Sequence, residues 1–115
     1  MYLVRAEAYA RLGGANEILG LADLNALRTA RIAGYTNVVL SGSALLQAIA
    51  DERRKELAGE GHRFFDLKRT GRTISRTTNC TSFCTLSPAD REWALPIPQS
   101  EILANPAAVQ NAGYL

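Results

Sequence analysis

A helical pattern over residues 45–71 constrains the fold more than any other feature of this sequence. At about 100° per residue, one face of that helix gathers six apolar side chains. They are Leu46, Ile49, Ala50, Leu57, Phe64 and Leu67. This spacing predicts a helix that packs one face against a core. Arg53 and Glu60 fall near the middle of the same face. A guanidinium and a carboxylate there indicate either an active site or an ion pair between packed helices.

Two glycines interrupt this pattern. Gly59 and Gly61 each destabilise a helix interior by up to ~1 kcal/mol relative to alanine. We therefore expect a break or kink near Gly61, with residues 62–68 as a separate short helix. At the other end, Ser41 or Ser43 is positioned to cap the long helix.

Two more helices are predicted ahead of this one. Residues 1–12 carry two apolar lines at helical spacing, which indicates a helix sandwiched between neighbours. The lines are Leu3, Ala6 and Ala10, and Val4, Ala8 and Leu12. Gly13 and Gly14 end this helix, and a second one is expected over residues 15–31.

The last third of the chain has no helical period. From Thr70 it is rich in Thr and Ser, which predicts an ordered but irregular connection. Pro96 and Pro98 impose extended backbone. Ser100 is positioned to cap a short helix over residues 101–104. The fold class is therefore mainly α, with a helical scaffold over residues 1–71 and an irregular loop and tail over 72–115.

Composition excludes several classes of function. The chain has 115 residues, 47% of them apolar, which suits one folded domain. Its 13 basic residues are interleaved with 11 acidic ones, which argues against a nucleic-acid surface. No apolar run reaches the ~18 residues of a transmembrane helix. The opening residues do not form a signal peptide, so we expect any export signal to lie upstream.

Arg53 and Glu60 are predicted to be structural. They lie two turns apart, roughly 10 Å along a helix, which is too far for a close pair. Because an unpaired buried charge costs several kcal/mol, each is expected to pair with another helix. The partner candidates are Arg5, Glu7, Arg28 and Arg31. A catalytic pair converging on one cleft is the less favoured alternative.

Neither a metal site nor a cofactor is predicted. His62 is the only histidine, and the cysteines lie in another segment, so zinc-ligand spacing is absent. Asp66 lies three residues from Arg63 and from Arg69, which suits ion pairs on a helix. The sequence has neither a phosphate-binding glycine loop nor a serine nucleophile elbow.

Cys80 and Cys84 are separated by three residues, a spacing typical of neither redox motifs nor zinc sites. A local disulfide and two free thiols remain equally compatible with this spacing. The aromatic residues leave a second choice open. They could include a sugar-stacking platform, or Trp93 could anchor the tail onto the helices, and we favour the anchor. The platform candidates are Tyr9, Tyr35, Phe83, Trp93 and Tyr114.

Four motifs resemble the C-terminal part of the SusD/RagB family. They are MYLVRAEAYARLG (1–13), LNALRTAR (24–31), ERRKELAGEGHRFFDLKRTG (52–71) and ALPIPQSEILANPAAVQNAGY (94–114). They occur in the family's order and cover nearly the whole chain. Ala112 stands where the family usually has proline, and Phe64 where tryptophan is common. Both changes should be tolerated.

The resemblance implies a fold of tetratricopeptide-like helix pairs and a function in nutrient binding. Members are lipidated proteins on the external face of the outer membrane, where they pass glycans or peptides to a TonB-dependent transporter. They are binding proteins, not enzymes. The resemblance further implies that Arg53, Glu60, Arg63 and Asp66 tie helices together. It assigns no ligand-binding residue to this chain.

Two other hypotheses remain. One is a stand-alone helical module that binds a protein partner, and the weaker one is a hydrolase that uses Glu60 and Asp66. We also expect the chain to form a homodimer through residues 1–12, because apolar side chains on two faces of one helix need cover.

Overall fold

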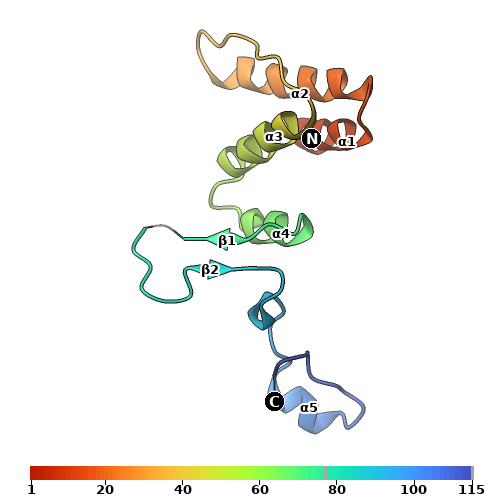
Figure 1. Cartoon of the computed structure of the whole chain (residues 1–115), viewed down its shortest axis with the longest axis vertical. Coiled ribbons are helices and arrows are strands. Elements are labelled where there is room, and N and C mark those ends of the chain that lie inside the picture. The colour runs from red at the N-terminus through yellow and green to blue at the C-terminus, as the bar shows by residue number, and fades with distance from the viewer. Residues whose placement is uncertain (77, 115) are drawn as a thin grey trace. The chain divides into compact units, whose positions relative to one another are not determined.

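The structure is a computed structural model that describes residues 1–76 and 78–114 (Figure 1). It divides into two units, Met1–Glu60 and Gly61–Leu115. The boundary therefore precedes the short fourth helix, whereas the sequence placed the end of the scaffold after it, at residue 71. Within the described residues, no helix combines the length and hydropathy needed to cross a membrane.

The first unit consists of three helices. They are α1 (Tyr2–Leu12), α2 (Asn16–Arg31) and α3 (Gly42–Glu56). The expectation of a mainly helical fold that begins with a helix pair is confirmed. α1 and α2 lie along each other, and α3 packs on both (Figure 1). The core between them contains Leu3, Ala6, Ala10, Leu24, Leu45 and Ile49.

Only one of the two apolar lines of α1 is covered. Leu3, Ala6 and Ala10 are buried against the other helices. On the second line, Val4 is 58% exposed and Leu12 is 71% exposed. An open hollow of about 400 Å³ lies on this uncovered side and is lined by Met1, Tyr2, Val4, Arg5 and Ala8.

A glycine sets the distance between α1 and α2. Gly20 is buried in α2, and a Cβ built on it would lie 2.8 Å from the carbonyl oxygen of Ala6. The same Cβ would lie 3.3 Å from the amide nitrogen of Ala10. Only a residue without a side chain lets the two backbones approach this closely.

The start of α3 differs from the serine cap that the sequence predicts. Ser41 occupies the cap position, but its side chain makes no capping hydrogen bond. Instead, the backbone amide of Gly42 donates to Oε2 of Glu17 at 2.8 Å. A carboxylate from the first turn of α2 therefore satisfies the free amide at the start of α3.

The end of α3 confirms the expected break. The helix stops at Glu56, and Gly59 and Gly61 follow with φ of 82° and 75°. Glycine adopts this left-handed conformation without the steric cost that other residues bear. The turn resets the helical phase, so residues after it no longer continue the apolar face of α3.

The second unit begins with α4 (His62–Arg69), in which Leu67 is buried. Two short strands follow, β1 (Ile74–Ser75) and β2 (Thr85–Leu86), paired antiparallel with Ile74 opposite Leu86. The connection that was expected to be irregular thus contains a small hairpin.

The tail carries a 3₁₀ turn, η1 (Arg91–Trp93), and a short helix, α5 (Gln99–Ala104). Pro98 stands at the cap position of α5, and its fixed φ suits the start of a helix. Ser100 therefore lies inside α5, and the prediction that it caps this helix is wrong.

Candidate functional site

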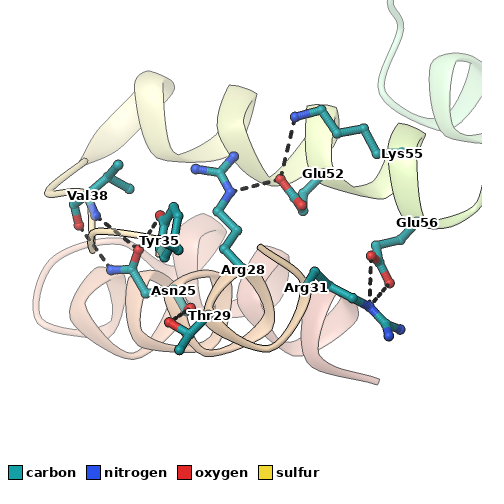
Figure 2. Close-up of polar contacts among 9 residues, drawn as sticks. All are labelled: Asn25, Arg28, Thr29, Arg31, Tyr35, Val38, Glu52, Lys55 and Glu56. Carbon is teal, nitrogen blue, oxygen red and sulfur yellow. Dashed lines mark hydrogen bonds and ion pairs between the residues drawn. The ribbon is translucent and has the colours of Figure 1, made fainter. Parts of the chain in front are cut away.

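A buried ion pair connects α2 and α3. Nε of Arg28 donates to Oε2 of Glu52 at 2.8 Å, and the two side chains are 14% and 4% exposed (Figure 2). Burial lowers the pKa of Arg28, but hydrogen bonds with Tyr35 and Glu52 and the charge of Glu52 outweigh it. The pKa of Arg28 therefore lies above its ordinary value, and the guanidinium stays charged.

The loop after α2 is held by a buried amide next to this pair. Asn25 donates through Nδ2 to the carbonyl oxygen of Val38 at 3.0 Å. Its Oδ1 accepts from the Val38 amide at 3.2 Å and from the Tyr35 hydroxyl at 2.8 Å. Figure 2 shows these side chains on one side of α2, beside Arg28. The arrangement fixes the return of the chain from α2 towards α3.

Two further ion pairs connect the helices of the first unit. Arg5 on α1 binds both carboxylate oxygens of Asp23 on α2, each at 2.7 Å. The hydrogen bond and charge of Asp23 raise the pKa of Arg5. Nearer the surface, Nε of Arg31 donates to both oxygens of Glu56 at 3.1 and 3.2 Å (Figure 2). Ion pairs therefore tie α2 at a defined register to both of its neighbours, α1 and α3.

The charged residues that the sequence singled out are not the buried ones. Both were expected to be buried. Glu60 is exposed in the turn after α3, so that expectation is wrong for Glu60, and Arg53 is only half-buried. Two physical reasons account for this. The buried line of α3 is Leu45, Ile49 and Glu52, one residue out of phase with Arg53. α3 also ends before it can carry Glu60 into the core.

None of the charged residues that the sequence singled out in α4 is buried in the second unit. Arg63 and His62 are exposed, and Asp66 is half-buried and accepts a 2.9 Å hydrogen bond from Nε of Arg69. An ion-pair network of Arg53, Glu60, Arg63 and Asp66 stays a prediction. Over residues 1–76 and 78–114, no three His, Cys, Asp or Glu side chains gather as metal ligands would.

The loop between β1 and β2 carries both cysteines. The structure joins Cys80 to Cys84 in a disulfide, one of the two states that their spacing left open. The amide of Arg76 donates to the carbonyl oxygen of Cys84 at 2.8 Å and closes the loop at its base. The redox state of the protein in its own compartment stays a prediction.

The C-terminal tail is held by side chains that imitate a paired strand. Gln110 accepts from the amide of Ile97 at 2.7 Å and donates to its carbonyl oxygen at 2.9 Å. Asn111 donates to the carbonyl oxygen of Leu95 at 2.6 Å. We call this arrangement the Gln110 clasp. Within the same unit, Nζ of Lys68 donates to the carbonyl oxygen of half-buried Trp93 at 2.8 Å.

Sequence reasoning missed Asp23, Asn25, Glu52 and Gln110. A signal for Glu52 existed, because it follows Leu45 and Ile49 at the i, i+4, i+7 spacing of a buried face. Among the described residues, no buried side-chain nitrogen or oxygen lacks a hydrogen-bond partner. Since the buried polar groups bind one another or the backbone, this arrangement is chemically suited to holding helices together.

Sequence comparison places the chain among known proteins. The model of the SusD family matches residues 1–114. The SusD-like protein P25 of Formosa agariphila is 33% identical over 124 residues, which cover 99% of this chain and 23% of that protein.

Solved structures are similar as well. A SusD superfamily protein from Bacteroides vulgatus has 37% identity and a TM-score of 0.83, over 99% of this chain and 26% of its own. A SusD-like carbohydrate-binding protein from the same species has 31% identity and a TM-score of 0.71, over 91% and 27%. The chain thus spans about a quarter of the length of these relatives.

Proposed function

The chain belongs to the SusD family, and we propose that it is the scaffold portion of a cell-surface protein that binds glycans. The observation that carries this proposal is the similarity over residues 1–114, which extends to a relative named a carbohydrate-binding protein. In the same proposal the protein lies on the external face of the outer membrane and works with a TonB-dependent transporter. No catalysis is proposed.

The geometry of the first unit supports a scaffold role. Its buried carboxylates, Asp23 and Glu52, each bind an arginine of a neighbouring helix. Oxygens of these carboxylates are occupied by arginines of other helices, whereas a general acid or base must be free to contact a substrate. These residues are therefore suited to fixing the helices rather than to chemistry.

A second candidate function is a helical interaction module. The observation that favours it is the uncovered line of α1, where Val4 and Leu12 are largely exposed and Val4 lines an apolar hollow. Large exposed apolar surfaces on soluble proteins commonly mark contact sites. A second copy of this chain is one such partner, in line with the homodimer expected from the sequence.

Gene deletion in the source bacterium tests the main proposal. Loss of the gene should abolish growth on one polysaccharide and leave growth on its constituent monosaccharide unchanged. The matched readout is surface location, because antibodies against this chain should bind intact cells. Purification of the protein should also retain a TonB-dependent transporter.

Two results would contradict the proposal. Normal growth of the deletion strain on every polysaccharide that the parent uses would remove the role in glycan uptake. Antibody binding only after cell lysis would exclude the external face of the outer membrane. A protein-interaction module would instead be recovered from the cell lysate as a small complex with its partner.

A further inference from the structure

The loop between β1 and β2 displays one aromatic ring to solvent. Phe83 is 83% exposed, and the ring follows Thr81 and Ser82 and precedes Cys84. We define the described residues 78–84 as the disulfide loop (Figure 1). A phenyl ring at this exposure gains little from folding, so its position in this loop requires another explanation.

The backbone of the disulfide loop is held in an unfavourable conformation at Phe83, whereas asparagine tolerates the left-handed region. Asn79 and Phe83 have φ of 54° and 51°, and they are the only non-glycine residues with positive φ among those described. A bulky residue rarely adopts the left-handed region. Such residues cluster at ligand contacts, where the surrounding structure compensates for the strain. Here the Cys80–Cys84 disulfide and the hydrogen bond from Arg76 to Cys84 supply that restraint.

The chemistry around the ring is neutral and polar. The sequence has no Asp, Glu, Lys, Arg or His between Arg76 and Asp90, although 21% of the chain is charged. The residues that precede the ring in the sequence instead carry hydroxyl and amide groups, namely Thr78, Asn79, Thr81 and Ser82. A rigid aromatic anchor flanked by small hydrogen-bonding side chains is a composition that binding loops use. The lack of charge suits an uncharged ligand rich in hydroxyls.

We propose that the disulfide loop is a carbohydrate contact, in which the Phe83 ring stacks on the apolar face of a sugar. Asn79, Thr81 and Ser82 then hydrogen-bond to the hydroxyls of the same or the next sugar. This inference rests on the proposed glycan-binding function and names one contact for it. Because the disulfide fixes the loop before binding, little conformational entropy is lost when a ligand docks.

Affinity electrophoresis of the 115-residue chain tests the inference. Native gels contain laminarin, amylopectin or galactomannan, three neutral polysaccharides. At least one should retard the wild-type chain. Phe83→Ala should weaken that binding about fivefold, equivalent to ~1 kcal/mol. Phe83→Tyr keeps a ring and should retain the affinity.

Phe65→Ala is the matched control, because it removes another exposed phenyl ring, 67% exposed, from the same unit. It should leave retardation unchanged, and circular dichroism should show that each variant folds.

Three results would overturn the inference. The first is unchanged mobility of the wild-type chain in all three gels. The second is equal retardation of wild type and Phe83→Ala. The third is Phe83-dependent binding to phosphatidylcholine vesicles without retardation by any polysaccharide. The last result would identify the loop as a lipid contact. None of these results predicts the outcome of the growth experiment, so the proposed function is tested separately from this inference.

Discussion

Arg28 on α2 and Glu52 on α3 form an ion pair of 2.8 Å with both side chains largely withdrawn from water. The residues are 24 positions apart in the sequence. Burial of such a pair stabilises little by itself, because desolvation offsets the attraction. The pair instead favours one packing register of α3 on α2, since a shifted register would leave a charge buried without its partner.

Removing one partner of this pair should destabilise the first unit strongly. Glu52→Gln leaves the Arg28 charge without a carboxylate, and the free energy of unfolding should fall by about 3 kcal/mol or more. Chemical denaturation measures this. The control is Glu56→Gln, whose partner Arg31 is 61% exposed, and it should cost less than about 1 kcal/mol.

Replacing both partners should restore much of the loss. In Arg28→Met/Glu52→Leu no buried charge remains, and such replacements are often neutral or stabilising. A loss below about 1 kcal/mol for Glu52→Gln alone would show that water reaches the pair.

The close contact of α1 and α2 predicts the sign of a glycine substitution. Alanine in place of a helical glycine ordinarily stabilises by up to ~1 kcal/mol. Gly20→Ala should do the opposite, because the new Cβ would lie 2.8 Å from the carbonyl oxygen of Ala6. We expect a loss of about 1–3 kcal/mol, typical of overpacking, by thermal or chemical unfolding. A more stable variant would contradict the helix contact described above.

The Gln110 clasp should control local opening of the tail. Gln110→Ala removes both hydrogen bonds to the backbone of Ile97. Hydrogen exchange at the Ile97 amide should become faster, while amides in α1 and α2 should exchange as before. Gln99→Ala is the matched control, since Gln99 begins α5 and takes no part in the clasp. Equal exchange at Ile97 in wild type and Gln110→Ala would show that the clasp does not hold the tail.

The uncovered side of α1 should drive self-association. Light scattering at rising concentration should show the chain forming dimers, because Val4 and Leu12 are 58% and 71% exposed on one helix face. Val4→Glu should shift the protein to monomers. Val39→Glu introduces the same charge at a loop position that is 92% exposed and should not affect assembly. A wild-type chain that stays monomeric at high concentration would contradict this prediction.

The sequence alone determined the number, order and approximate ends of the main helices. Their signals are local: apolar residues at helical spacing, glycines such as Gly13 and Gly61 at the ends, and prolines in the tail. Family membership followed from the motifs for a similar reason, since a motif is a local string of residues.

Only the tertiary structure decided which charges are buried. A one-residue difference in helical phase separates Glu52 from Arg53. The same spacing places Glu52 in line with Leu45 and Ile49, and Arg53 in line with Leu46 and Ala50, so periodicity fits both. The choice depends on Arg28, which reaches Glu52 from another helix. Likewise, the sequence does not show that Gly20 meets Ala6, or that Gln110 pairs with Ile97 across 13 positions. These contacts form only when distant segments pack, so no local pattern encodes them.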